Sequence, residues 1–399
     1  MSGLSRSPVI LQVLPALHAG GIERGTIEMV QAIAARGGVA LVASAGGQMA
    51  PQVEQAGGRH ISIGLTTKNP YCIWRNADRL AQLIKAEGVD ILHARSRAPA
   101  WSGMLAARRM RSAFVTTWHG VYGEELPFKK RYNAVMASGD RVIAISDFVA
   151  ARISSNYGVE PQRLRTIPRG ADLAVFDPHL VHSSRRYALS DDWNLPIGAA
   201  VIMLAGRITA WKGHALLLEA LARLPADTCE WVCLLVGPEQ RHDGYAAELL
   251  ALAGKLGIRH RLRFAGHCDD MPSALSLADV VVAPSLKPEP FGRVVVEAQA
   301  MGRPVVVAAH GGPMETVRHG VSGYLFPPGD VGVLTDTLAH VLSMSRTDRE
   351  NLGHWARAGV VERYSTEAMQ KATIAVYDEL LLERPGSPTW PKLPTWPRS

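Results

Sequence analysis

Long hydrophobic runs are absent from this sequence. The longest apolar segments, such as residues 201–205, have the length of a strand, whereas a helix that spans a bilayer needs about 20 apolar residues. The first residues also lack the basic start and the apolar stretch of a secretory signal. These absences exclude a helical membrane-spanning protein and predict a cytoplasmic location.

Cysteine is scarce, and metal-binding motifs are missing. The chain has four cysteines, and their spacing fits neither a zinc site nor a Cys-x-x-Cys motif. We expect Cys229 and Cys233 to be buried, reduced thiols. No Asp-x-Asp metal motif stands at a suitable place, and the acidic pairs at 191–192 and 269–270 are typical of turns and helix caps. The sequence therefore predicts no metal and no cofactor.

Positive charge is concentrated in the first half of the chain. The formal net charge is +7, but residues 1–190 carry 23 Lys and Arg against 13 Asp and Glu, whereas the remaining residues carry 20 against 23. Basic clusters lie at residues 108–111 and 129–131. No zinc-finger, RRM or KH pattern indicates a nucleic-acid partner. The basic half indicates an anionic membrane surface or an acidic acceptor, although a plain solvated surface explains it equally well.

Short apolar strands alternate with amphipathic helices along most of the chain. In the first half, strands are predicted at residues 9–14, 39–44, 60–63, 90–93, 114–117 and 141–144. In the second half, strands are predicted at residues 201–205, 231–236, 262–265, 280–283 and 304–308. Such alternation is typical of parallel sheets with crossover helices. The predicted fold class is therefore α/β, with two Rossmann-like, doubly wound domains.

The alternation stops at residues 177–196, which are polar and bounded by prolines. We expect this linker to divide an N-terminal domain (1–183) from a C-terminal domain (197–364). A helix at 365–383 is expected to pack back on the N-terminal domain. Residues 384–399, which include five prolines and two tryptophans, are expected to form a loose tail, although the repeated Trp-Pro also suits a docking element. Because ligands of open α/β sheets bind beyond the carboxyl ends of the strands, we expect an active site in a cleft between the two domains.

Glycines and basic residues follow two of the predicted strands. Gly20 and Gly21 precede a helix, where they let the backbone approach a ligand and where the helix start favours an anion, although a simple turn explains them as well. Arg207 and Lys212 follow the strand at 201–205, and both side chains suit phosphate oxygens.

The segment from Ser285 to Glu297 carries the strongest signal. Glu289 lies between two prolines and therefore in a rigid loop, and Gly292 frees the backbone where the next helix starts. Glu297 lies in the first turns of that helix. Two carboxylates beside a helix N-terminus suit a ligand that carries hydroxyl and phosphate groups.

Six motifs, taken in order, resemble those of the family 4 retaining glycosyltransferases and cover nearly all of residues 9–383. They are Gly20-Gly21-Ile22-Glu23, Trp118-His119-Gly120, Gly206-Arg207 with Lys212-Gly213, Glu289-Pro290-Phe291-Gly292 through Glu297, Gly311-Gly312-Pro313-Met314-Glu315, and residues 320–330. The resemblance implies the GT-B fold. It also implies transfer of a sugar from a UDP-, GDP- or ADP-sugar with retention of the anomeric configuration and without a metal.

The resemblance further implies which residues bind the donor diphosphate. Arg207 and Lys212 match the basic residues that hold it, and Gly20 and Gly21 match the glycines that approach it. Each of these groups would stabilise the charge that grows on a departing diphosphate.

The remaining donor contacts are also implied by the resemblance. Glu297 binds the nucleotide ribose, Glu289 lies beside the donor sugar, and the amides of Phe291 and Gly292 help to hold it. His119 approaches the sugar, with a strand-end histidine bonded to backbone as the alternative. The expected catalytic residues are His119, Glu289, Arg207 and Lys212.

Arg169 departs from the family pattern, because Asn is common at its position. We expect Arg169 to contact an anionic group of the acceptor or donor, and Arg95 and Arg97 to lie on the acceptor side. With its basic clusters, the first half also resembles bacterial enzymes that extend lipopolysaccharide or other envelope glycans. The expected acceptor is a glycan or a lipid-linked saccharide, and the expected location is the inner face of the plasma membrane.

Other functions share this architecture. A GT-B phosphorylase or a nucleotide-sugar epimerase is one alternative, but a phosphorylase needs a lysine-bound pyridoxal phosphate, and Lys212 in a phosphate loop suits that role poorly. A non-catalytic sugar-binding module is another, and the presence of Glu289 and Glu297 together with Arg207 and Lys212 argues against it.

Overall fold

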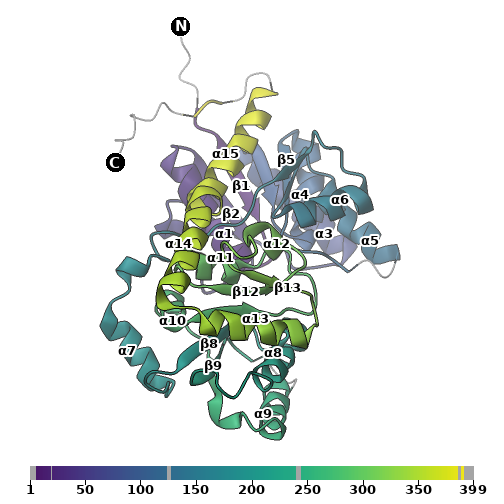
Figure 1. The fold of residues 1–399 in the computed structure, drawn as a ribbon. Coiled ribbons are helices and arrows are strands. Elements are labelled where there is room, and N and C mark those ends of the chain that lie inside the picture. The colour runs from purple at the N-terminus through teal and green to yellow at the C-terminus, as the bar shows by residue number, and fades with distance from the viewer. Residues whose placement is uncertain (1–5, 19, 124–126, 240–243, 385–387, 391–399) are drawn as a thin grey trace. The chain divides into compact units, whose positions relative to one another are not determined.

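The structure, a computed structural model, describes residues 6–18, 20–123, 127–239, 244–384 and 388–390. The chain divides into two compact units, and many of their helices and strands are labelled in Figure 1. Unit 1 contains Met1–Arg169 and Met369–Ser399, and unit 2 contains Gly170–Ala368. No helix within the described ranges is long and apolar enough to cross a membrane.

Unit 1 is built on a seven-stranded parallel sheet with the order β3-β2-β1-β4-β5-β6-β7. Its strands are β1 (Val9–Val13), β2 (Val39–Ser44), β3 (Arg59–Ser62), β4 (Ile91–Ala94), β5 (Ala113–Trp118), β6 (Arg141–Ala144) and β7 (Leu164–Thr166). Its helices are α1 (Gly21–Ala35), α2 (Ala50–Gln55), α3 (Pro70–Glu87), α4 (Arg97–Met110), α5 (Pro127–Asn133), α6 (Asp147–Tyr157) and α15 (Thr366–Leu382), the last of which begins three residues before unit 1 resumes. The central strands are buried on both faces and mostly apolar, as is usual for parallel sheets.

The C-terminal helix α15 belongs to the core of unit 1. Its residues Met369, Ile374 and Tyr377 are buried in the same cluster as Ile10 of β1 and Val42 of β2. Figure 1 shows α15 as the yellow helix that crosses β1 and β2. Unit 1 therefore needs the end of the chain to complete its hydrophobic core.

Unit 2 is built on a six-stranded parallel sheet with the order β10-β9-β8-β11-β12-β13. Its strands are β8 (Ala200–Ala205), β9 (Trp231–Val236), β10 (Leu262–Gly266), β11 (Val280–Ala283), β12 (Val305–Ala308) and β13 (Tyr324–Phe326). Its helices are α7 (Ser183–Asp192), α8 (His214–Leu221), α9 (Tyr245–Lys255), α10 (Met271–Leu277), α11 (Arg293–Ala300), α12 (Pro313–Thr316), α13 (Val331–Ser343) and α14 (Arg346–Arg363). The core joins the strands to α8, α9 and α13. The predicted α/β class with two parallel sheets is confirmed.

The boundary between the units differs from the predicted linker. Unit 1 ends at Arg169 rather than at residue 183, and the polar stretch contains helix α7. The sequence of α7 has no apolar stripe that would indicate a helix, and none of its residues is buried. Arg185 of α7 forms an ion pair of 2.5 Å with Asp270, the N-cap residue of α10.

Two smaller expectations also need correction. Cys233 is buried in β9, but Cys229 is exposed, because it lies in the turn before that strand. Much of the expected loose tail lies outside the described residues, but Trp390 packs on the core of unit 1 and donates a hydrogen bond of 2.5 Å to Asp378.

His214, the first residue of α8, makes the stability of unit 2 depend on pH. It is fully buried, and burial lowers its pKa to about 4. The unfolded chain therefore takes up a proton near pH 6.5, whereas the folded chain does not do so until about pH 4. Unit 2 should lose up to about 1.4 kcal/mol of stability for each pH unit between these values as the pH falls.

Urea unfolding at pH 7 and pH 5 checks this. The decrease in the free energy of unfolding between pH 7 and pH 5 should be smaller by about 2 kcal/mol in His214→Gln than in the wild type, because glutamine does not titrate. The exposed His354 supplies the control variant, His354→Gln, which should keep the wild-type pH dependence. An unchanged pH dependence in His214→Gln would contradict the assignment.

Candidate functional site

In both sheets, predicted site residues follow the two strands between which the strand order reverses. In unit 2 the order reverses between β8 and β11, and Arg207 and Glu289 follow these two strands. In unit 1 it reverses between β1 and β4, which are followed by Gly20 and Arg95. Open α/β sheets bind ligands beyond the carboxyl ends of the strands at such switch points. Each unit thus has candidate site residues at the switch point of its own sheet.

In unit 2, Lys212 and Glu289 form an ion pair. Lys212 Nζ lies 2.8 Å from Glu289 Oε1, and the two side chains are 16% and 13% exposed. Ser285 Oγ donates a second hydrogen bond to the same oxygen, at 2.5 Å. Lys212 Nζ also lies 4.7 Å from the centre of the Trp211 ring, a cation–π contact. Both polar contacts use Oε1, so the described residues leave Oε2 of Glu289 to accept hydrogen bonds from a ligand.

Close backbone packing holds the Glu289 loop in place. The carbonyl oxygen of Glu289 accepts a hydrogen bond of 2.8 Å from the Gly312 amide. A Cβ atom on Gly311 would lie 2.4 Å from that oxygen, and one on Gly213 would lie 1.9 Å from the oxygen of Pro284. Both glycines also have positive φ angles, 70° and 78°. The loops after β8, β11 and β12 can therefore meet only because these positions are glycine.

Phe291, Gly292 and Glu297 lie at the start of α11. Gly292 is its N-cap with φ 86°, and the Phe291 ring is only 3% exposed. Glu297 is 7% exposed, and its Oε1 accepts a hydrogen bond of 2.9 Å from Arg293. The sequence analysis missed Arg293 as a partner, although the i, i+4 spacing on a helix signals such a pair.

Arg207, which follows β8, is exposed. Within the part of the chain that the structure describes, no hydrogen bond or ion pair engages its guanidinium group. Arg207 therefore keeps all its donors for an anion, whereas Lys212 shares its charge with Glu289.

In unit 1, α1 begins at the predicted glycine pair. Gly20 is the N-cap residue in extended backbone, with φ 168°, and Gly21 is the first residue of the helix. Neither residue has a side chain that could satisfy the amide groups of the first turn, so these amides point to solvent or to a ligand.

His119, which follows β5, is a neutral imidazole at pH 7. Burial, assisted by the nearby charges of Arg169 and Arg95, lowers its pKa well below the usual value. Its Nε2 atom is buried and has no hydrogen-bond partner among the described residues. A buried ring nitrogen of this kind can bind a ligand hydroxyl.

Arg95 and Arg169 are buried within unit 1. The sequence analysis had instead predicted that both would contact a ligand. Arg95 is 2% exposed and donates from Nη1 to Gln12 Oε1 at 2.8 Å. Arg169 is 5% exposed and donates from Nη2 to the carbonyl oxygen of Gly21 at 2.5 Å. Both side chains are thus engaged with the chain around α1.

Arg97 lies at a cavity of about 610 Å³ in unit 1. It donates from Nη1 to Asn133 Oδ1 at 2.9 Å and lies 4.1 Å from the centre of the Tyr122 ring. The other described residues that line the cavity are Lys68, Gly123, Phe128, Lys129, Tyr132 and Asn133. Three of the lining side chains are cationic and none of those described is acidic, which suits an anionic ligand.

A buried histidine that the sequence analysis did not single out joins α15 to the sheet. His93 of β4 bonds to Tyr377 through Nδ1 and to Thr117 through Nε2, both at 2.7 Å. Burial lowers the pKa of His93 well below its usual value. Because His93 and Tyr377 are far apart in the sequence, no local pattern indicates this contact.

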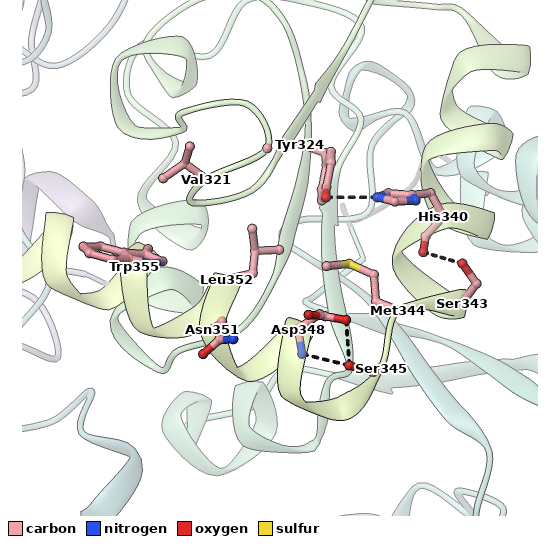
Figure 2. A pocket seen from close by; sticks show the side chains of 11 residues that line it. Val321, Tyr324, His340, Ser343, Met344, Ser345, Asp348, Asn351, Leu352 and Trp355 are labelled. Atoms are coloured by element: carbon pink, nitrogen blue, oxygen red, sulfur yellow. Dashed lines mark hydrogen bonds between the residues drawn. The ribbon is translucent and has the colours of Figure 1, made fainter.

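A second large cavity, of about 650 Å³, lies in unit 2 (Figure 2). Figure 2 shows Trp355 on one side of it and Tyr324, hydrogen-bonded to His340, on the other. Tyr324 is the first residue of β13, so this cavity lies at the amino end of a strand. The Glu289 loop follows the carboxyl end of a parallel strand. The cavity is therefore separate from the candidate donor residues.

Comparison with known proteins agrees with this geometry. The family model for glycosyl transferases group 1 matches residues 188–358, and that for glycosyltransferase family 4 matches residues 19–175. The D-inositol 3-phosphate glycosyltransferase of Mycobacterium tuberculosis H37Rv is 32% identical over an alignment of 320 residues, and the match covers 74% of this chain and 64% of that protein. The match thus spans less than two thirds of this relative.

Solved structures match nearly the whole chain. A glycosyltransferase from Rickettsia africae is 32% identical, with a TM-score of 0.87 over 94% of this chain and 99% of that one. Anabaena Alr3699/HepE in complex with UDP-glucose is 25% identical, with a TM-score of 0.78 over 93% of this chain and 99% of that one. The chain therefore belongs to the family 4 glycosyltransferases and has the GT-B fold.

Proposed function

We propose that this protein is a retaining glycosyltransferase that moves a sugar from a nucleotide-diphosphate sugar to a glycan or lipid-linked acceptor. The observation that carries the proposal is the group of Arg207, Lys212 and Glu289 at the switch point of the unit 2 sheet. It combines cationic donors for a diphosphate with a fixed carboxylate for sugar hydroxyls. The similar Anabaena protein, solved in complex with UDP-glucose, supports a donor of this class.

Arg207 and Lys212 would neutralise the diphosphate as the bond to the sugar breaks. Amides at the start of α11 and α1 would add partial positive charge. Glu289, held by Lys212 and Ser285, would orient the sugar, and Glu297 would bind the ribose. Because the cations are part of the chain, we propose that transfer needs no metal.

The ion pair of Lys212 also bears on the phosphorylase alternative. A lysine that carries pyridoxal phosphate needs a free amino group to form the imine, whereas Lys212 Nζ is bound to Glu289 Oε1 at 2.8 Å. The lysine of this loop is therefore better suited to binding phosphate.

A cavity in unit 1 supports the proposed class of acceptor. The cavity lined by Lys68, Arg97 and Lys129 suits an acceptor with an anionic group. The relative from M. tuberculosis is named for a phosphorylated compound, D-inositol 3-phosphate. With the basic first half, this favours an acceptor in bacterial lipopolysaccharide or another envelope glycan, and a peripheral location at the inner face of the plasma membrane.

Removing Arg207 should weaken donor binding. Arg207→Ala deletes a charge-assisted contact, and the dissociation constant of the preferred nucleoside diphosphate should rise at least about tenfold. Calorimetric titration with UDP, GDP and ADP measures this and identifies the base. Arg223→Ala, at an exposed site beyond the other end of α8, is the matched control and should bind normally. Equal affinity in Arg207→Ala and the control would refute the assignment of Arg207.

Stereochemistry and metal dependence test the mechanism. In front-face substitution the acceptor hydroxyl arrives on the side from which the diphosphate leaves, so the product should have the anomeric configuration of the donor. Proton NMR of the early product measures this, and activity should persist in excess EDTA. An inverted anomer would overturn the retaining mechanism. Loss of activity on chelation, restored by a divalent ion, would show that Arg207 and Lys212 do not suffice.

Charge reversal on α5 tests the membrane proposal. Phe128 is 66% exposed on this helix, beside basic side chains that include Lys130. Lys130→Glu should weaken binding to vesicles that contain anionic lipid by at least about fivefold, since one basic residue near such a surface contributes about 1 kcal/mol. Lys255→Glu, at an exposed site on unit 2, is the control. Binding to neutral vesicles that equals binding to anionic ones, or no binding to either, would contradict the proposal.

A further inference from the structure

Arg169, the last residue of the first segment of unit 1, folds its side chain back onto the start of α1. Its Nη2 atom donates to the carbonyl oxygen of Gly21 at 2.5 Å and lies 3.9 Å from Glu28 Oε2. The guanidinium group is thus bound to the first turn of α1 and lies near a carboxylate in the second. The residue that precedes the passage into unit 2 is in this way fixed to the glycine loop.

Gly25 is the position on α1 that receives this side chain. A Cβ atom there would lie 2.0 Å from Nη2 and 2.4 Å from Cζ of Arg169, well inside the 3.0 Å that real Cβ contacts respect. Gly25 has an ordinary helical backbone, so its conformation does not require glycine. Glycine is a poor helix former. Its presence in the second turn is explained by the guanidinium group that covers it.

A second buried arginine, Arg95, helps to attach α1 to the sheet. Arg95 Nη1 donates to Gln12 Oε1 at 2.8 Å, and Gln12 Nε2 donates to the carbonyl oxygen of Thr26 at 3.1 Å. These contacts anchor the second turn of α1 to β1 and β4. They do not reach the first turn, where Arg169 is bound.

We propose that Arg169 is a positioning residue, which fixes the Gly20-Gly21 loop and the first turn of α1 for the donor diphosphate, and that Gly25 is glycine in order to receive it. The inference rests on the proposed role of the glycine loop in binding the donor. It assigns Arg169 to the chain itself rather than to an anionic group of the substrate.

The pairing of Arg169 with Gly25 can be tested by a double-mutant cycle. Gly25→Ala in the wild type should lower the thermal midpoint, because the new methyl group displaces the guanidinium group. In the Arg169→Ala background the same change should raise the midpoint, because the space is vacant and alanine is the better helix former. Gly359→Ala, at a helical glycine of α14 with open space around it, is the control and should not lower the midpoint in either background.

The positioning role needs a readout beyond stability. Arg169→Ala should raise the KM for the donor by about tenfold, the loss expected for a charge-assisted hydrogen bond, and should leave the KM for the acceptor unchanged. Amide hydrogen exchange at residues 21–25 should become faster. Arg169→Gln keeps a donor for the Gly21 carbonyl without the charge. It should show a smaller effect, and it replaces Arg169→Ala in the cycle if that variant does not fold.

Each outcome decides the inference. Equal damage from Gly25→Ala in both backgrounds would show that Arg169 does not set the requirement for glycine. A raised acceptor KM with an unchanged donor KM would show that Arg169 is a ligand of the acceptor. A wild type that binds no nucleoside diphosphate would refute the proposed donor site and, with it, this role of Arg169. Normal binding by the wild type and by Arg169→Ala alike would refute the inference alone.

Discussion

Parallel strand pairing constrains everything at the carboxyl edge of each sheet. Each crossover returns the chain to the same edge, so within unit 2 the loops after β8, β11 and β12 emerge together. Their backbones come into close contact, with Gly213 against Pro284 and Gly311 against Glu289. The 2.8 Å ion pair between Lys212 and Glu289 depends on this close approach. The strand order therefore determines both where glycine is required and which charges can meet.

The pairing of charges in unit 2 makes its two basic residues unequal. Lys212 is paired with Glu289, so a phosphate that binds Lys212 must share its ammonium group with the carboxylate. An ammonium group has three donors, so Lys212 can bind a phosphate and keep its contact with Glu289 at the same time. The Glu289 carboxylate then retains its cationic partner. Arg207 is exposed and gives up little to bind an anion. The net affinity for a diphosphate should therefore come more from Arg207, whereas Lys212 links the phosphate to the orientation of Glu289.

The sequence predicted the elements that have a strong local pattern. The predicted strands at 39–44, 141–144, 231–236 and 280–283 have the observed bounds. The strands β7 and β13 were missed because three residues are too few to show a period, and α7 was missed because it has no apolar face. Element order follows from local patterns, whereas strand order and register depend on contacts that no local pattern contains.

The candidate site shows the same limit. Residue types indicated Arg207, Lys212 and Glu289, and the strand order brought them to one switch point. The partners of these residues could not be predicted, because Lys212 and Glu289 are 77 residues apart. The arginines misled for a physical reason. The sequence predicted that Arg95 and Arg169 contact a ligand, because the type of the residue suits an anion. Their burial depends on partners that only the fold supplies.

Burial, assisted by these two arginines, also affects the chemistry available to His93 and His119. An arginine keeps its charge at any pH that a folded protein tolerates, whereas an imidazole can release its proton. Burial beside Arg95 and Arg169 therefore leaves His119 neutral, and burial with Arg95 does the same for His93. His93 uses both ring nitrogens, on Tyr377 and Thr117, and is committed to the fold. His119 keeps a buried Nε2 that no described residue engages. A neutral His119 would therefore serve a ligand as a hydrogen-bonding group rather than as a cation.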